Sequence, residues 1–295
     1  MKSETMKSFG VVALAVATFV AAPALRAQEK DACGKPMTAE KVAQRALDYA
    51  EINNVAGAHE YYHSAFKHQE ELDDIWSKRD DIAWQNGSDF YKSRTSVENF
   101  YGKGIKQADP HGALWYHMLT TPIVEVAGDG QTAKAIWMSF GNVTGSSPSG
   151  GANMQWTEEK YGMDFIKENG HWKIWHLRTY VEFYTPFDKG WAVSNMSAPA
   201  GAVNAMQMGG APPSGGQGQQ AGAPPQGAGA PPNDKDTGAT VKQEPGANMT
   251  GNLMKPDEKG DYYIGYYPDR KAPAFDPVPP APYCTWKDTK GYVQN

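Results

Sequence analysis

Cysteine, basic clusters and long apolar runs are scarce in this 295-residue chain, and each shortage excludes a class of protein. The two cysteines, Cys33 and Cys284, are too few for a cysteine-rich metal cluster. A net charge of −5 without a basic cluster argues against nucleic acid and against an anionic membrane surface as partners. Beyond the N-terminal stretch, no run approaches the roughly 20 apolar residues that a membrane span requires.

Glycine-based nucleotide motifs are missing as well. The sequence has neither a Rossmann nor a P-loop pattern, and the G-x-S-x-G elbow of serine hydrolases does not occur. We therefore expect a protein that uses no cofactor.

The first 27 residues have the features of an export signal. Lys2 and Lys7 precede an apolar run from Val11 to Ala22, and small residues follow, with cleavage expected after Ala24 or Ala27. This predicts a secretory signal peptide at residues 1–27 and a periplasmic or secreted protein. In an oxidising compartment the two cysteines could pair with each other, pair between subunits or stay free.

Composition divides the rest of the chain into three parts. Residues 37–191 carry the periodic apolar patterns of a folded domain. Residues 192–252 are rich in Gly, Pro, Ala and Gln and have no aromatic residue, which predicts a flexible linker. Residues 253–295 are rich in aromatics and proline, and we expect this tail to dock on the folded body. Four tyrosines of the tail are candidates to cover a cavity mouth: Tyr262, Tyr263, Tyr266 and Tyr267.

Helical patterns come first in residues 37–191 and strand patterns follow. Thr38 is a candidate N-cap for a helix from Val42 through Phe66, with a possible break at residues 53–57. A short strand in "DDIAWQNG" and a small helix capped by Thr95 or Ser96 come next. Two long hairpins then turn at "GDG" and at "ENG". This order predicts an α+β domain.

Two stretches resemble the SnoaL-like branch of the nuclear-transport-factor-two-like superfamily. They are "HMLTTPIVEVAGD" at His117–Asp129 and the hairpin "YGMDFIKENGHWKI" that starts at Tyr161. The resemblance implies a cone-shaped, curved antiparallel sheet wrapped around N-terminal helices, and subunits that assemble as a dimer or trimer. Two positions depart from the family pattern: Thr121 replaces a usual Asn, and Met163 replaces a frequent Asp.

The sequence also contains H-E-x-x-H, at His59, Glu60 and His63. On a helix this spacing is typical of zinc proteases, with the histidines as ligands and the glutamate as general base. The longer zinc motif is not continued here, because Phe66 and Gln69 occupy its next positions. A zinc metallohydrolase is therefore kept as a minor alternative, and we predict no metal.

Helical periodicity places one stripe of side chains toward the sheet: Ile52, Val55, His59, Tyr62 and Phe66, with His63 at its edge. Strand alternation predicts the opposite wall. In the first long strand Trp115 and His117 share a face, and Tyr161 lies on the inward face of the hairpin. Trp172, Ile174, His176 and Arg178 are expected to share one face of the last strand. All of these polar groups could equally be hydrogen-bonded core residues.

Histidine and tyrosine side chains in an aromatic-walled cavity can act as general acids and bases. We assign His59, Tyr62 and His117 as catalytic candidates, and His63, Trp115, Tyr161, His176 and Arg178 as substrate-binding candidates. The chain is also similar to the diarylpropane γ-formaldehyde lyases of bacterial lignin catabolism. This resemblance implies a cofactor-independent lyase that acts on a hydroxylated aromatic compound through a quinone methide. The alternative is an exported binding protein for small aromatic molecules.

Overall fold

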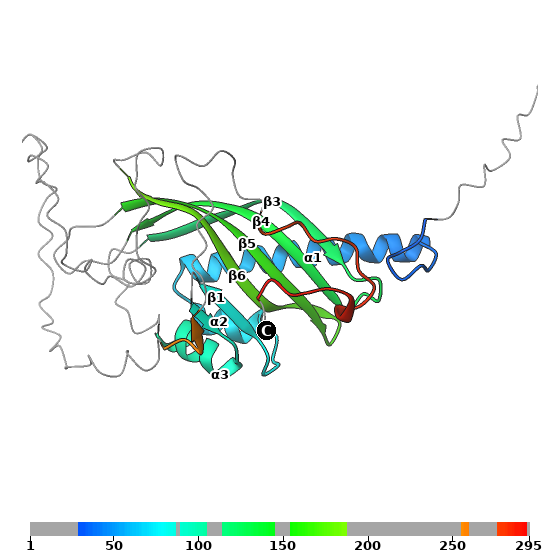
Figure 1. Cartoon of the computed structure of the whole chain (residues 1–295), viewed down its shortest axis with the longest axis horizontal. Coiled ribbons are helices and arrows are strands. Elements are labelled where there is room, and N and C mark those ends of the chain that lie inside the picture. Colours follow the sequence, from blue (N-terminus) through cyan, green and yellow to red (C-terminus); the bar gives the residue numbers. More distant parts are fainter. Residues whose placement is uncertain are drawn as a thin grey trace, which may run out of the picture.

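A long helix and a curved sheet make up the folded domain (Figure 1). The computed structural model describes residues 29–86, 89–104, 114–144, 154–187, 255–259 and 276–293. Helix α1 (Ala39–Ser64) begins where the Thr38 side chain accepts a hydrogen bond from the Lys41 amide. It continues without the break that we expected at residues 53–57. The predicted signal peptide, the linker and the four tail tyrosines lie outside the described residues.

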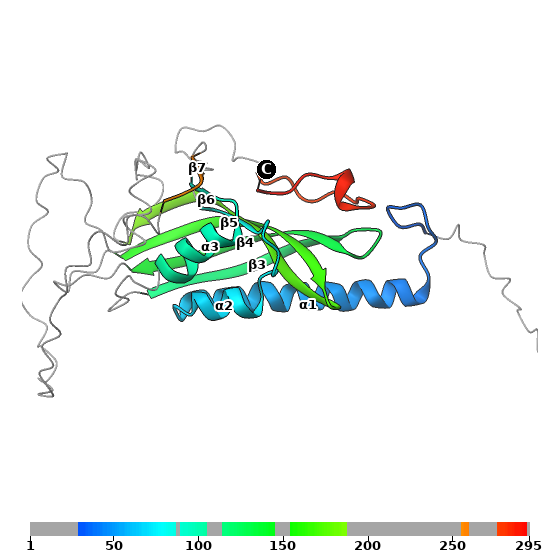
Figure 2. The ribbon, with the colours of Figure 1, turned by 90° about the horizontal axis from the view of Figure 1, so that it is seen from below.

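The sheet has seven strands in the order β3-β4-β5-β6-β1-β2-β7. Four long strands form an antiparallel meander: β3 (Leu114–Val126), β4 (Thr132–Thr144), β5 (Met154–Glu168) and β6 (His171–Pro186). Asn169 and Gly170 have positive φ at the β5–β6 turn, as the Asn-Gly signal predicted. The sheet is curved and unclosed and holds α1 on one face, as the predicted α+β cone requires (Figure 2).

Three short strands extend the sheet beyond β6, and short helices connect them to the rest of the domain. Helix α2 (His68–Asp74) follows α1, and strand β1 (Ala83–Asn86) pairs in parallel with β6 and antiparallel with β2 (Asp89–Tyr91). Helix α3 (Arg94–Val97) is capped by Ser93, not by Thr95 or Ser96 as predicted, and runs on into the π-helix η1 (Glu98–Gly104). Strand β7 (Glu258–Lys259) adds to β2.

The C-terminal tail lies on the face of the sheet opposite α1 (Figure 2). The described tail residues, 276–293, include the short helix η2 (Trp286–Asp288). The tail is joined to the start of the domain by a disulfide between Cys33 and Cys284, one of the three possibilities that the sequence left open. The docking that we predicted for the tail therefore holds for these residues. None of the helices among the described residues is both long and apolar enough to cross a membrane.

Candidate functional site

Four histidines gather on the concave side of the sheet. His59 and His63 come from α1, His68 from the start of α2, and His117 from β3. The ring centroid of His63 lies 5.7 Å from that of His59, 5.1 Å from that of His68 and 5.5 Å from that of His117. All four side chains are buried. Residues far apart in the sequence thus meet because α1 packs across β3.

Tyr161 and Trp115 close this cluster from the sheet side. The Tyr161 ring lies 5.8 Å from the His59 ring and 6.3 Å from the His117 ring. The Trp115 ring lies 5.3 Å from the His63 ring. Both aromatic residues are buried. Five predicted candidates, His59, His63, Trp115, His117 and Tyr161, therefore lie in one place.

The fully buried carboxylate of Glu71, on α2, accepts hydrogen bonds from His59 and from two neighbouring side chains. Its Oε1 accepts hydrogen bonds from His59 Nδ1 at 2.6 Å and from Trp76 Nε1 at 2.8 Å. Its Oε2 accepts one from the Tyr101 hydroxyl at 2.6 Å. A buried carboxylate with three donors is well satisfied. It fixes the orientation of the His59 ring and leaves His59 Nε2 facing the cluster.

His63 Nδ1 lies within hydrogen-bonding distance of two side chains, Tyr101 and His68. His63 Nδ1 lies 3.1 Å from the Tyr101 oxygen and 3.1 Å from His68 Nε2. Since the Tyr101 proton is donated to Glu71, the Tyr101 oxygen is an acceptor for a proton on His63 Nδ1.

Burial and charge drive the pKa values in this cluster apart. Burial alone would lower the pKa of His59, but the charge and hydrogen bond of Glu71 raise it above its ordinary value. Burial raises the pKa of Glu60 to about 8, and the nearby charge of His59 only partly opposes this shift. Burial, with the charge of His59, lowers the pKa of His117 to about 4. At neutral pH the cluster therefore holds both a protonated carboxyl group, on Glu60, and an unprotonated imidazole, on His117.

Polar groups without partners line the concave face of the sheet next to these side chains. Strand register places His117, Ser139, Thr157, Tyr161 and Thr179 on the same side. Among the described residues, no hydrogen-bond partner is found for buried atoms of four of them: His117 Nδ1, Ser139 Oγ, Thr157 Oγ1 and Thr179 Oγ1. Buried polar atoms are nearly always paired, with protein, water or a bound molecule. This wall is therefore suited to a polar guest.

Tyr62 is not part of the cluster, so the predicted helix stripe is wrong at that position. The buried stripe of α1 is Asp48, Ile52, Val55, Ala56, His59, Glu60 and His63. His63 takes the place that we gave to Tyr62, because the helix presents the i+4 rather than the i+3 position after His59. The Tyr62 hydroxyl donates instead to the Asp74 carboxylate, near the surface.

His176 and Arg178 lie on the opposite face of the sheet, and here the predicted alternation is wrong. Asp164 pairs with His176, but the next residue, Phe165, pairs with Ile174, so Trp175 is an extra residue in β6. Such a β-bulge shifts the alternation by one position. Trp172 and Ile174 face the core as predicted, whereas His176 and Arg178 face the C-terminal tail.

The two histidines of the H-E-x-x-H motif each have a ring nitrogen engaged in hydrogen bonding. Nδ1 of His59 is bonded to Glu71, and Nδ1 of His63 lies against Tyr101 and His68. Within the described part of the chain, no three His, Cys, Asp or Glu side chains form a metal-binding group. The arrangement is that of a hydrogen-bonded cluster of titratable side chains.

The sequence indicated Glu60 only as part of a zinc motif, and three other members of the cluster were missed: His68, Glu71 and Tyr101. A signal existed for the first two, because His68, Glu71 and Leu72 lie at i, i+3 and i+4 and form the buried face of α2. A charged residue on a buried helix face marks a position that needs partners. Nothing in the local pattern around Tyr101 distinguished it from a core residue.

The comparisons with known proteins agree with this fold. Residues 44–178 match the family described as "SnoaL-like domain". Residues 44–178 thus form a SnoaL-like domain, as the two sequence motifs indicated. No curated protein is significantly similar to it in sequence.

Similar solved structures share low sequence identity with the chain. A Mycobacterium tuberculosis protein of unknown function is 16% identical, with a TM-score of 0.41 over 57% of this chain and 90% of its own. A proposed scytalone dehydratase from Novosphingobium aromaticivorans is 13% identical, with a TM-score of 0.41 over 50% and 93%. A hexachlorocyclohexane dehydrochlorinase from Novosphingobium barchaimii is 16% identical, with a TM-score of 0.39 over 50% and 94%.

Proposed function

We propose that the protein is a cofactor-independent lyase that eliminates by general acid–base catalysis. The observation that carries this proposal is a pair of groups with opposite pKa shifts in one cluster, Glu60 and His117. Glu60 Oε1 lies 3.8 Å from His59 Nε2, and the His117 ring lies 5.5 Å from the His63 ring. Environments that separate pKa values in this way create an acid and a base at the same pH.

Each side chain has a role in the proposed elimination. His117, unprotonated and with a buried Nδ1 that has no partner among the described residues, accepts the proton of the substrate. Glu60, protonated at neutral pH, gives a proton to the departing hydroxyl group. His59, whose pKa is raised by Glu71, provides positive charge for a developing oxyanion.

The substrate class that we propose is a hydroxylated aromatic compound, as in a lignin-type 1,2-diaryl-1,3-diol. Loss of the phenolic proton and of the benzylic hydroxyl as water gives a quinone methide. Deprotonation of the primary alcohol then breaks its carbon–carbon bond, releases formaldehyde and returns the electron pair to the ring, which leaves a stilbene. The electrons stay within the substrate, so no oxidant or reductant is needed. Aromatic walls from Trp115 and Tyr161 suit such a flat molecule.

The test is to incubate purified protein with the diaryl diol, with and without a chelator, and to follow stilbene absorbance and formaldehyde. His117→Gln should lower the rate by about 100-fold or more, the usual range for a positioned proton-transfer group. His171→Gln is the matched control, because the His171 side chain is 74% exposed and lies outside the cluster. No product with the unaltered protein would refute this substrate.

Binding without turnover is the second candidate function. The unpaired polar atoms of the concave wall would serve an exported binding protein for aromatic compounds equally well. Ligand-induced change of tryptophan fluorescence, with the ligand unchanged by mass spectrometry, would favour this function over the lyase.

We also propose that the protein acts in the periplasm as a homo-oligomer. The outward side chains of the edge strand β3, namely Leu114, Tyr116 and Met118, are 40%, 53% and 57% exposed. An exposed apolar row of this kind is suited to contact with a second copy. Light scattering during size-exclusion chromatography tests it, and a monomeric mass at micromolar concentration would contradict it.

A further inference from the structure

The outer face of the sheet carries a second group of chemically active side chains, away from the concave cluster. A cavity of about 600 Å³ lies between this face and the C-terminal tail. The sheet contributes Lys134 of β4 with Arg178 and Tyr180 of β6, and the tail contributes Asp276, Lys290 and Tyr292. None of these residues takes part in the proposed elimination.

Two cations of this cavity contact aromatic rings, and one of them, Lys134, also donates a hydrogen bond to the Lys290 carbonyl. Lys134 Nζ lies 4.1 Å from the centre of the Tyr292 ring, and the Arg178 guanidinium lies 4.3 Å from that of Tyr180. Arg178 Nη1 donates one long hydrogen bond, of 3.5 Å, to the Tyr292 carbonyl. Its Nε is buried without a hydrogen-bond partner among the described residues. The guanidinium therefore retains donors for a ligand.

The charges around the cavity do not cancel. Lys134, Arg178 and Lys290 line it together with Asp276, and Asp164 lies 3.5 Å from Lys134 Nζ. Three cations and two carboxylates leave a formal charge of +1, with histidine counted as neutral. Burial also lowers the pKa of Lys134, which indicates that removing this cation from water is costly. A ligand with one negative charge would neutralise the cavity.

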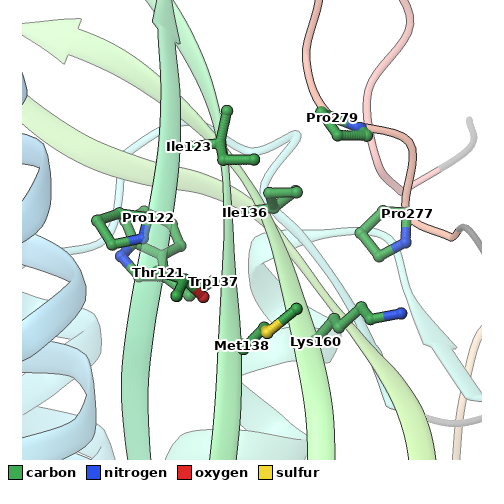
Figure 3. A pocket seen from close by; sticks show the side chains of 9 residues that line it. All are labelled: Thr121, Pro122, Ile123, Ile136, Trp137, Met138, Lys160, Pro277 and Pro279. Atoms are coloured by element: carbon green, nitrogen blue, oxygen red, sulfur yellow. The ribbon is translucent and has the colours of Figure 1, made fainter.

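An apolar groove of about 350 Å³ adjoins this cavity under the same tail prolines (Figure 3). Pro277 and Pro279 line both spaces, and Figure 3 shows them facing Ile123 and Ile136 of the sheet. Lys134, Ile136 and Met138 alternate along β4 and so form one row on its outer face. The ammonium group of Lys134 is therefore followed along the same face by the apolar side chains of Ile136 and Met138.

We propose that this composite site binds a small monocarboxylate with an apolar, aryl-sized body. The carboxylate lies between Lys134 and Arg178, since a guanidinium can bond both carboxylate oxygens. The apolar body lies against Ile136 and Met138 beneath Pro277 and Pro279. The site is separate from the concave cluster and does not depend on the proposed elimination.

Calorimetric titration of the full, disulfide-bonded chain with 3-phenylpropanoate tests the proposal. We expect saturable binding, and 3-phenylpropanamide, which lacks the charge, should bind about tenfold more weakly or worse. Arg178→Gln should weaken binding of the carboxylate by a similar factor, and Ile136→Ser should weaken it through the loss of apolar contact. Lys287→Gln removes the same charge from an exposed tail position that does not line the cavity, and should leave the affinity unchanged.

A second measurement follows binding in the unaltered protein, so its result does not depend on whether a variant folds. In protein labelled with ¹³C at the methionine methyl groups, the Met138 signal, assigned with Met138→Leu, should move on addition of 3-phenylpropanoate. Absence of saturable binding, equal affinity for the amide, or an unmoved Met138 signal would overturn the proposal. Binding that is lost in His117→Gln and kept in Arg178→Gln would overturn it as well, because the ligand would then occupy the concave cluster.

Discussion

Glu60 adjoins His59 in the chain and is 9% exposed, and its environment determines how the proposed site responds to pH. Since burial raises its pKa to about 8 while that of His117 falls to about 4, acid and base coexist between these values. The rate with substrate should therefore fall above pH 8, as Glu60 ionises, and below pH 4, as His117 is protonated. Glu60→Gln should lower the rate and remove the basic limb of the pH–rate profile. A basic limb that persists in this variant would assign the acid to another group.

The same carboxyl group links pH to stability. Its folded-state pKa of about 8 exceeds the ordinary value of 4.5, so its favourable contribution is full below pH 4.5 and is lost as pH rises to 8. Glu60→Gln should therefore gain stability relative to the unaltered protein across this window, by up to several kcal/mol. Denaturant unfolding at pH 5 and pH 8 measures the difference, and exposed Glu70→Gln is the control. An equal effect at both pH values would contradict the assignment.

Glu71 acts on the site through His59, as a positioning residue. Replacing it with glutamine removes the negative charge that raises the pKa of His59 and mismatches one of three buried donors. We expect Glu71→Gln to lower the pKa of His59 in an NMR titration and to cost about 3–5 kcal/mol of unfolding free energy. Asp73→Asn on the same helix is exposed and should change neither quantity. An unchanged His59 titration would show that Glu71 does not set its charge state.

At the scale of the element, β5 has a glycine at the point where the tail packs. A Cβ added to Gly162 would lie 2.7 Å from Cγ of the Tyr292 ring, too close for real atoms. Gly162→Ala should displace Tyr292, lower stability and increase amide exchange in the tail. Gly57→Ala is the matched control, because a Cβ there meets nothing within 4 Å inside α1. That variant should gain about 0.5–1 kcal/mol of helix stability. Equal behaviour of the two variants would contradict the close contact.

Periodicity predicted the elements better than it predicted the site. The spacing around Thr38 and the Asn169-Gly170 turn are local signals, so α1 and the long hairpins could be read from the sequence. The bulge at Trp175 has no local signal, because its cause is the pairing of β6 with β5. It moved His176 and Arg178 to the outer face. The Glu71–His59 bond joins two elements, and single-helix periodicity contains no information about such a contact.

Thr121 shows how a departure from the family pattern appears in the structure. It has a φ of 49°, in the left-handed region, where the pairing of β3 with β4 shifts register between Thr120 and Ile123. Asparagine, the usual family residue, tolerates this region far better than a β-branched residue does. The sequence revealed the substitution, but only the backbone reveals that it falls at an irregular point of the edge strand.

At the scale of the whole molecule, one disulfide joins the tail to the beginning of the domain, and backbone hydrogen bonds join it to the β3–β4 turn. Cys33 and Cys284 are 251 residues apart, and the Gly128 and Asp129 amides donate to the Tyr283 and Cys284 carbonyls. The double variant Cys33→Ser, Cys284→Ser should unfold more easily, by up to about 5 kcal/mol for so long a loop.

Loss of the disulfide should act on the outer face before it acts on the concave cluster. The tail covers Asp164, which accepts from the Tyr292 amide, whereas His59 and Glu71 are joined by contacts that do not involve the tail. Hydrogen exchange of the double variant should therefore increase first at Tyr292 and in the tail, with α1 and α2 still protected. The proposed carboxylate site should weaken with it, while the proposed lyase activity should be retained at moderate temperature. Simultaneous loss of protection in the tail and in α2 would mean instead that the two faces of the sheet unfold as one unit.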